Sequence, residues 1–370
     1  MEPQLSTFTA AQKNRQTMRT VARAFKCLVV AQSDISAAAM VARAHREWAD
    51  HPQLERAFMA AVTGMTTSTD SSLVGVEIND LLGVVRPLTV VGRLQGLRRV
   101  PFSAALTAMS GGTSAGWVGE GKPAPVVKPQ FSRLATPLGV LKNVALCVED
   151  VELVRSADPD SELTISQDFV GALVGVLDSS FIDPQSAAVA GVRPASVTNG
   201  APAFASSGST ALLVDADLGR LVESLLARGS TLQFAHWVMH PITAAFLARL
   251  RNVNGDYAFP DVTVLGGTLM GLPVIVSASV PHVGSPSSTS IVLLDASRIW
   301  FAEDNAVELS ISRSAAIQML DNPTDDITTP TATTLVSMFQ TGTVALRGTQ
   351  ARNWKIADPG FAAVLNNVVD

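Results

Sequence analysis

The chain has 370 residues, of which 47% are hydrophobic and 16% charged, and its formal net charge is −5. The negative charge argues against a dedicated reader of nucleic acid. The small charged fraction indicates either a large core or a surface that other chains cover. The length favours two domains with extensions.

Membrane insertion and secretion are both disfavoured. Residues 262–294 contain no Asp, Glu, Lys or Arg, but their prolines, glycines and serines exclude a spanning helix. The first 16 residues have no apolar run of the kind that a signal peptide needs, so we expect a cytoplasmic protein. Cys27 and Cys147 lie in apolar runs and are predicted to be buried thiols.

The first 60 residues predict helices over 11–30 and 34–61, with Ser33-Asp34 as a helix start. Residues 63–72 are small and polar, as in a linker. Five basic residues occur without an acid between them, which indicates either a face turned toward DNA or, more commonly, a solvated helix face. These residues are Lys13, Arg15, Arg19, Arg23 and Lys26.

Residues 97–148 predict a long two-stranded hairpin with a Gly/Pro-rich loop over 111–130. The return strand has apolar residues at even positions, which gives it one apolar face. A hairpin with one apolar face is only marginally stable unless it lies on another surface. These even positions are Leu134, Leu138, Val140, Val144, Leu146 and Val148.

The next segments alternate between helix and strand. A helix is predicted between Asp158-Pro159 and Asp183-Pro184, followed by a loop over 186–210 and a helix over 215–229 that Asp215 caps and Gly229 ends. A strand and a helix follow in 234–252, with Pro241 in the first helical turn and then an Asn254-Gly255 turn. Strands are predicted near 272–279, 290–295 and 306–312, and two more flank residues 340–342. The mixture predicts an α+β fold.

Enzymatic motifs are weak. Residues 112–116 fit the G-x-S-x-G pattern around Ser114, but the glycines and prolines that follow exclude the required helix, so an α/β serine hydrolase is a minor alternative. Residues 266–271 have phosphate-loop spacing but are followed by Leu272-Pro273 instead of Lys-Ser/Thr. The acids Asp321, Asp325 and Asp326 suit a solvated loop better than a cation site. We predict no catalytic residue, no cofactor and no metal site.

Six segments together resemble the major capsid proteins of tailed bacteriophages with the Hong Kong 97 fold. Residues 116–131 (GWVGEGKPAPVVKPQF) resemble the extended loop of that family, and residues 148–182 resemble the start of its spine helix. Residues 237–259 and 266–281 resemble its axial domain. Residues 291–312 and 336–347 resemble the strands that complete both domains. The resemblance spans about 73–360.

The resemblance implies an architecture of four parts. Residues 1–72 would be an N-terminal helical region and arm, which we expect to be retained. Residues 73–96, 149–211 and 325–358 would form a peripheral domain with a spine helix at about 161–183. Residues 97–148 would form the extended loop hairpin, and residues 212–324 and 359–370 the axial domain.

The resemblance also implies a function in assembly. Identical subunits would form pentamers and hexamers of an icosahedral head around double-stranded DNA, assembled in the host cytoplasm. Portal, scaffold and decoration proteins are further expected partners, and a membrane is not. An encapsulin-type nanocompartment shell is the alternative within the fold. Cross-linking candidates are Lys122, Lys128 and Asn353, which lack a motif match and are taken as ordinary surface groups. The candidates for contact between subunits are Trp117, Glu120, Lys122, Lys128, Phe131 and Arg133.

Overall fold

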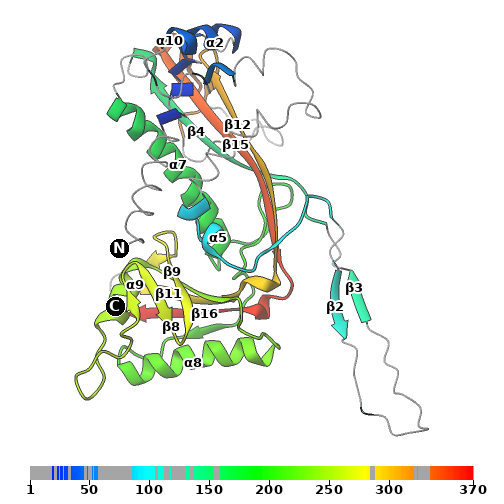
Figure 1. Cartoon of the computed structure of the whole chain (residues 1–370), viewed down its shortest axis with the longest axis vertical. Helices are drawn as coiled ribbons and strands as arrows, with labels where there is room; N and C mark the ends of the chain where they lie inside the picture. Colours follow the sequence, from blue (N-terminus) through cyan, green and yellow to red (C-terminus); the bar gives the residue numbers. More distant parts are fainter. Residues whose placement is uncertain are drawn as a thin grey trace. The chain divides into compact units, whose positions relative to one another are not determined.

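The computed structural model describes residues 86–104, 107–111, 117, 130–133, 137–152, 159–283, 288–320, 323 and 334–369, together with parts of 19–56. These residues form the predicted mixture of helices and strands (Figure 1). The chain divides into two compact units. Unit 1 consists of Met1–Arg93, Lys142–Asp178 and Asp304–Ala351, and unit 2 of Leu94–Leu141, Ser179–Glu303 and Arg352–Asp370.

The N-terminal part of unit 1 is helical where it is described. Helix α2 (Ile35–Ala44) begins directly after Ser33-Asp34, as predicted. The helix predicted over 34–61 is interrupted, because the helical state ends at Ala44 and is next described at residues 52 and 54–56. Small side chains let these short helices approach one another, and Cys27, Ala38, Ala42 and Leu54 are buried together. Residues 63–72 lie outside the described residues.

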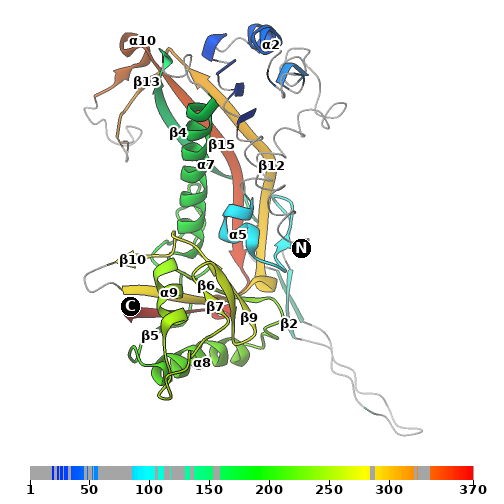
Figure 2. The ribbon, with the colours of Figure 1, turned by 60° about the vertical axis from the view of Figure 1, so that its left-hand side comes forward.

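A four-stranded sheet has the strand order β1-β12-β15-β4. Helix α7 (Pro159–Ile182) lies alongside β4 (Leu141–Asp150) and β15 (Thr343–Ile356) in both ribbon views (Figure 2). One face of these strands packs on the helix within unit 1: Val344 and Leu346 are buried with Phe169 and Leu173. The predicted helix is therefore confirmed at both ends, as expected from a proline in its first turn and Asp183-Pro184 after its last residue.

The predicted return strand of the 97–148 hairpin is wrong in one respect. The hairpin consists of β2 (Thr107–Gly111) and β3 (Gln130–Arg133), whereas β4 belongs to the four-stranded sheet. Residues 137–140 are not in a strand, because Pro137 has no N–H to donate and Gly139 adds backbone freedom. Of the even-numbered apolar positions, Val144, Leu146 and Val148 belong to β4, whereas Leu138 and Val140 precede it outside any strand. The alternating pattern did not reveal where the strand begins.

Unit 2 is built on an eight-stranded mixed sheet with the order β5-β16-β11-β6-β9-β8-β7 and with β10 paired to β11. Every residue of β6 (Ala235–Met239) is buried, which is typical of a central strand covered on both faces. Helices α8 (Ala211–Ala227) and α9 (Pro241–Arg249) pack on the same face, where Leu221, Trp237 and Leu293 share one core. The strand with its following helix and first-turn Pro241 is confirmed.

The remaining elements are short connections and sheet strands. They are η1 (Arg86–Leu88), α5 (Val90–Arg93), β1 (Arg98–Arg99), β5 (Ala203–Ala205), β7 (Val262–Thr263), β8 (Gly266–Leu269), β9 (Leu272–Val276), β10 (His282–Val283), β11 (Ser288–Asp295), η2 (Ala296–Arg298), β12 (Ile299–Ser312), β13 (Ala316–Ile317), β14 (Val336–Ser337), α10 (Met338–Thr341), η3 (Pro359–Phe361) and β16 (Ala362–Val369).

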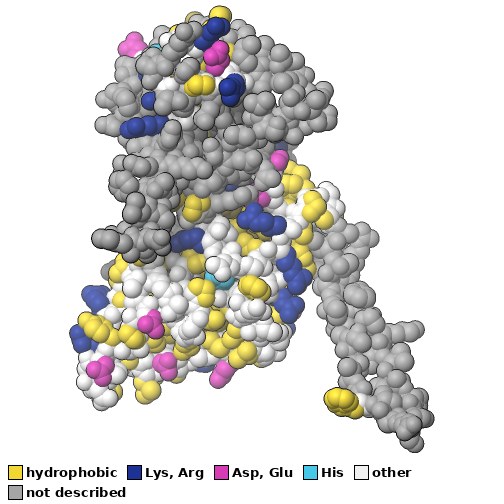
Figure 3. All heavy atoms as spheres, viewed as in Figure 1, with side chains coloured by type: hydrophobic (Ala, Val, Ile, Leu, Met, Phe, Trp, Pro, Cys, Tyr) yellow, Lys and Arg dark blue, Asp and Glu magenta, His cyan; other side chains and the backbone are white. Residues whose placement is uncertain are grey.

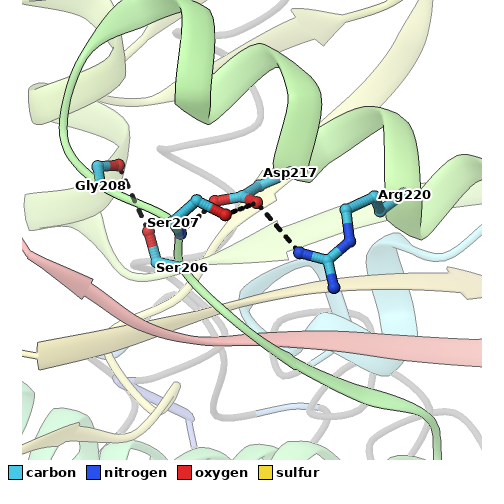
Figure 4. A network of polar contacts seen from close by, with 5 residues as sticks. All are labelled: Ser206, Ser207, Gly208, Asp217 and Arg220. Carbon is cyan, nitrogen blue, oxygen red and sulfur yellow. Dashed lines mark hydrogen bonds and ion pairs between the residues drawn. The ribbon is translucent and has the colours of Figure 1, made fainter.

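The start of α8 differs from the prediction. The helix begins at Ala211, so Asp215 is an exposed residue of its second turn and not a cap. The acid that organises this end is Asp217, which is 1% exposed. It accepts hydrogen bonds from the backbone N–H of Ser207 (2.6 Å) and from the Ser207 hydroxyl (2.7 Å), and Arg220 lies 3.3 Å away (Figure 4). Asp217 therefore ties the preceding loop to the helix.

Glycines 266 and 267 serve strand packing rather than phosphate binding. Both have positive φ angles, of 125° and 133°. A Cβ on Gly267 would overlap the backbone oxygen of Asp261, in the antiparallel pairing of β7 with β8. The segment continues into strand β9 and not into the helix that a phosphate loop requires.

The two strands predicted around residues 340–342 are confirmed only in part. The first is the two-residue β14, after which the chain forms the short helix α10 and turns at Gly342 in the left-handed conformation. The second, β15, is 14 residues long.

Candidate functional site

The hairpin β2–β3 carries three of the predicted contact residues. Its register pairs Thr107 with Arg133 and Met109 with Phe131. Trp117, in the connection between the two strands, has a relative exposure of 105% and therefore touches nothing else in the described chain. Glu120, Lys122 and Lys128 lie outside the described residues. The hairpin thus presents one large apolar side chain to its surroundings.

Among the described residues of unit 1, the face of the four-stranded sheet that points away from α7 carries exposed apolar side chains. Val144 and Leu146 of β4 are 41% and 51% exposed, whereas their neighbours Ala145 and Cys147 pack toward the helix. These two side chains border a groove of about 410 Å³, which we call the outer-face groove. Its lining includes Val144, Leu146, Ala315, Ile317, Ala345 and Arg347. Sequence analysis predicted an apolar face here but not the groove.

More exposed apolar side chains lie on the segment that supplies part of this groove. β13 pairs antiparallel with β14, and α10 follows directly. The exposed residues are Met319 (54%), Leu320 (60%), Leu335 (56%) and Phe339 (83%). Apolar residues gathered at this density on a surface mark an interaction site more often than scattered single residues do.

A charged cluster anchors the chain where it leads into the hairpin. Strand β1 pairs in parallel with β12, and Arg99 lies 3.4 Å from a carboxylate oxygen of Glu303. The other oxygen of Glu303 lies 3.0 Å from Arg352, and the side chains of both residues are buried. Beside this cluster, Leu138 packs on Trp300. The cluster was not predicted, although an acid within the apolar stretch 299–303 was a signal for it.

The described members of the basic N-terminal run are partly buried. Arg19, Arg23 and Lys26 lie on helical residues, and the Arg23 guanidinium stacks over the Trp48 ring at 4.9 Å. Trp48 in turn stacks on His45 with ring centroids 4.3 Å apart. Lys13 and Arg15 lie outside the described residues. Arg23 thus has a structural contact within the chain, and the role of the run toward DNA stays a prediction.

Comparison with known proteins identifies the family. The model of the phage capsid family matches residues 83–367, which is over three quarters of the chain. The chain belongs to the phage capsid family.

Individual relatives of this capsid protein come from bacteriophages. It is 35% identical over 373 residues to the capsid polyprotein of Pseudomonas phage PAJU2, an alignment that covers 96% of this chain and 55% of the relative. The capsid protein therefore spans about half the length of that relative. In fold it resembles a solved structure from Gordonia phage Cozz, with a TM-score of 0.54, 15% identity and coverage of 78% and 87% of the two chains. A structure from Mycobacterium phage Ogopogo gives a TM-score of 0.52, 18% identity and coverage of 75% and 92%.

The family assignment points to a structural protein and not to an enzyme. Ser114 and the acids at 321, 325 and 326 lie outside the described residues. Within the described part of the capsid protein, no cluster of three His, Cys, Asp or Glu side chains could hold a metal ion. No helix among the described residues is long and apolar enough to cross a membrane.

Asn353 and the two cysteines of the capsid protein are buried or half-buried. Asn353 is not the surface group that was predicted: it is 8% exposed, and its side-chain amide donates to the Gly139 carbonyl over 2.7 Å. Cys27 is a buried free thiol, as predicted. Cys147 is half-buried, and burial together with Glu149 and Asp168 raises the pKa of its thiol to about 11. It is therefore a poor nucleophile at neutral pH.

The face of unit 2 drawn in Figure 3 carries hydrophobic side chains interspersed with polar and charged ones. Several of them are large and exposed, among them Leu212 (78%), Val253 (102%) and Leu265 (92%). Leu212 lies in the first turn of α8, whereas Val253 and Leu265 lie in turns of unit 2.

Proposed function

We propose that this chain is the shell-building subunit of a tailed-phage head with the Hong Kong 97 fold. Identical copies form pentamers and hexamers, and these close into an icosahedral shell around double-stranded DNA. Unit 1 corresponds mainly to the peripheral domain with α7 as its spine helix, and the sheet of unit 2 to the axial domain. Residues 97–140 then carry the extended loop.

One observation carries the proposal beyond the family assignment. The chain exposes a Trp side chain completely on its hairpin and leaves an apolar sheet face uncovered. A monomer gains nothing from either feature, because both leave apolar surface in water. Contacts between copies remove this surface, and heterologous contacts of this kind close into rings when the rotation between subunits allows it.

The contents and partners of the shell follow from the same proposal. Packaged DNA contacts the inner surface without base recognition, through basic residues such as Arg19 and Lys26. Portal, scaffold and decoration proteins bind the assembled shell, and the protein resides in the virion after assembly in the host cytoplasm. Catalysis has no part in this function.

Electron microscopy of the purified, overexpressed full-length chain tests the proposal. We expect closed particles built from pentamers and hexamers, and we expect DNA inside particles isolated from infected cells. A chain that stays monomeric under all assembly conditions contradicts the proposal. Particles that contain enzymes in place of DNA favour a nanocompartment shell.

A further inference from the structure

The segment between helix α5 and strand β1 is held by two contacts with the start of β6. We call this segment, residues 94–97, the strap. The backbone N–H of Gln95 donates a hydrogen bond to Nε2 of His236 over 3.3 Å. Gly96, with a φ of 88°, lies so close to Phe234 that a Cβ on it would stand 2.5 Å from the phenyl ring. The strap leads directly into β1 and then into the segment that carries the hairpin β2–β3.

The hydrogen bonds of His236 determine which of its ring nitrogens carries the proton. Nδ1 lies 3.0 Å from the Phe234 carbonyl oxygen, which only accepts hydrogen bonds, so Nδ1 is the donor. Nε2 of the neutral ring then carries no hydrogen and accepts from Gln95. His236 is 3% exposed, so a second proton on Nε2 would face the Gln95 N–H with little access to water. The hydrogen bond to the strap therefore requires a neutral His236.

We propose that residues 94–97 form a pH-sensitive strap. Protonation of His236 breaks its hydrogen bond with the Gln95 backbone and releases the strap from Phe234, while β1 stays paired with β12. The strap, Phe234 and His236 all belong to unit 2 of a single chain, so this switch goes beyond the proposed function and does not rest on it.

Asp295, at the end of the neighbouring strand β11, is the carboxylate that acts on His236, and its oxygens already have partners. One oxygen accepts from the Ser230 hydroxyl over 2.6 Å. The other accepts from the backbone N–H of Ser297 over 3.0 Å and from its hydroxyl over 2.7 Å. These three hydrogen bonds hold Asp295 in place when His236 gains a proton, so the strap is the part that moves.

The other elements beside His236 do not titrate in the mildly acidic range. Strand β9 and the strap contain no titratable side chain. In η2, Arg298 stacks over the Phe361 ring at 4.6 Å. Arg93 and Arg98 flank the strap, and arginine keeps its charge throughout this range. The pH dependence of the strap therefore belongs to His236.

The release favoured by acid follows from proton binding to the closed and the open strap. Burial lowers the pKa of His236 in the closed state, and the Phe234 carbonyl and Asp295 oppose this shift less strongly. An open strap exposes the ring to water and returns its pKa toward the usual value of about 6.5. The open state thus binds the proton more readily, and its population rises as pH falls below this value, by no more than about tenfold per pH unit for one proton.

The contacts of β1 keep the change local. Strand β1 pairs in parallel with residues 300–301 of β12, and the N–H of Val100 donates to the Phe301 carbonyl over 3.0 Å. These backbone hydrogen bonds do not titrate. Gly96 supplies the pivot, because a residue without a Cβ reaches other backbone conformations at little cost. Lowering the pH should therefore move the strap and leave β1 paired.

Hydrogen–deuterium exchange of the full-length chain, followed by mass spectrometry from pH 7.5 to 5.5 and corrected for the intrinsic exchange rate at each pH, is the direct test. We expect the protection of the Gln95 amide to fall about three- to tenfold over this range, while that of residues 99–100 stays constant. Exchange at the C2 position of histidine measures the protonation of His236 in the same chain and should change at the same pH. Constant protection of the strap, or an equal loss in the strap and in β1, overturns the switch.

Two histidine substitutions separate His236 from a general effect of acid. His236→Gln places an amide oxygen, which accepts a hydrogen bond but does not titrate, near the position of Nε2. We expect the strap of this variant to have the same protection at every pH in the range. His240→Asn removes a histidine four residues further along the chain and leaves a residue type that can cap α9, so it should keep the pH dependence of the wild type. A His236→Gln chain with the wild-type pH dependence overturns the proposal.

Gly96→Ala tests the strap without changing a titratable group, and it decides the question even if His236→Gln does not fold. The added Cβ would overlap the Phe234 ring, so the strap should be displaced at every pH. We expect its protection at pH 7.5 to fall at least about threefold and to change little on acidification. Wild-type protection of the strap in Gly96→Ala, with the wild-type pH dependence, would overturn the role of the contact with Phe234 and with it the switch.

Discussion

Glu303 of β12 and Arg352 of β15 form an ion pair with a separation of 3.0 Å, and the side chains of both are buried. Arg99, whose side chain is half exposed, approaches the second oxygen of Glu303 at 3.4 Å. The pair joins two neighbouring strands of the four-stranded sheet next to the start of the 98–140 segment. A buried carboxylate that loses its partner keeps its desolvation penalty, so the pair constrains which changes the sheet tolerates.

We expect Arg352→Met to lower the free energy of unfolding by about 3 kcal/mol, because it removes the buried guanidinium that lies 3.0 Å from the Glu303 carboxylate. Urea denaturation followed by tryptophan fluorescence measures the change. Arg347→Met, on the exposed side of the same strand, is the control and should shift stability by no more than about 0.5 kcal/mol. The double variant Glu303→Leu/Arg352→Met should recover much of the loss, and a double variant as unstable as Arg352→Met alone would show that shape and not charge determines the effect.

Lowering the pH should destabilise the folded subunit through His236. This side chain is 3% exposed, its Nε2 accepts a hydrogen bond from the Gln95 backbone N–H over 3.3 Å, and Nδ1 lies 3.0 Å from the Phe234 carbonyl. Burial lowers the pKa of His236 below its usual range, while the Phe234 carbonyl and the Asp295 carboxylate oppose this shift less strongly. The folded arrangement requires a neutral His236 ring. The same ring takes up a proton more easily in the unfolded chain.

The direction in which stability changes with pH follows from the difference in proton binding between the folded and the unfolded chain. The unfolded chain takes up the proton near pH 6.5 and the folded chain only at lower pH, so stability is lost as pH falls from the usual histidine pKa toward the lowered one. We expect His236→Gln to flatten this part of the pH profile, whose slope one proton limits to about 1.4 kcal/mol per pH unit. Thermal unfolding between pH 7.5 and 5 measures it.

The ends of a helix were predictable where the residues at these ends have a conformational preference of their own. Pro159 and Pro241 mark helix starts, and Gly229, with a φ of 79°, marks a helix end. Each of these signals acts within a few residues and needs no partner elsewhere in the chain. Asp215 shows the limit of such signals, because a capping residue type also occurs inside helices, and here Asp217 has the organising role.

Sheet partners were not predictable, because alternation specifies a face but not the neighbour. The pattern over 134–148 predicted one strand of a hairpin, whereas β4 joins β15, almost 200 residues further along the chain. The outer-face groove could not be predicted for the same reason, since Val144, Ile317 and Ala345 meet only after β4, β13 and β15 are arranged. The exposure of Trp117 was predictable because a Gly/Pro-rich loop cannot bury an indole by itself, and its contact with another subunit stays a prediction.

Asp217 provides a test of how the loop before α8 is held (Figure 4). We expect Asp217→Ala to lower the free energy of unfolding by about 2 to 3 kcal/mol, because it removes a charged acceptor and leaves the Ser207 N–H without that partner. Amide hydrogen exchange should become faster at Ser207. Asp215→Ala removes an acid from the same helix at an exposed position and should change stability by no more than about 0.5 kcal/mol. Equal losses in the two variants would refute the specific role of Asp217.

Two Gly→Ala substitutions should change the stability of the subunit in opposite directions, because the two glycines have different backbone conformations and surroundings. Gly267 has a φ of 133°, and a Cβ there would overlap the Asp261 backbone oxygen, which belongs to rigid main chain and cannot move aside. Gly171 lies on the exposed side of α7 with open space around its Cβ position. Alanine has the higher helix propensity, so Gly171→Ala should stabilise the subunit by about 0.5 to 1 kcal/mol.

Gly267→Ala should instead destabilise it by about 1 to 3 kcal/mol or more, through backbone strain at a positive φ and through separation of β7 from β8. Differential scanning calorimetry of both variants beside the wild type gives the two signs in one experiment. Since Gly267 belongs to the segment that has phosphate-loop spacing, a neutral Gly267→Ala variant would remove the packing explanation for its glycines. If Gly267→Ala lowers the midpoint of thermal unfolding and Gly171→Ala raises it, the close approach of two strands explains the glycine spacing at 266–271.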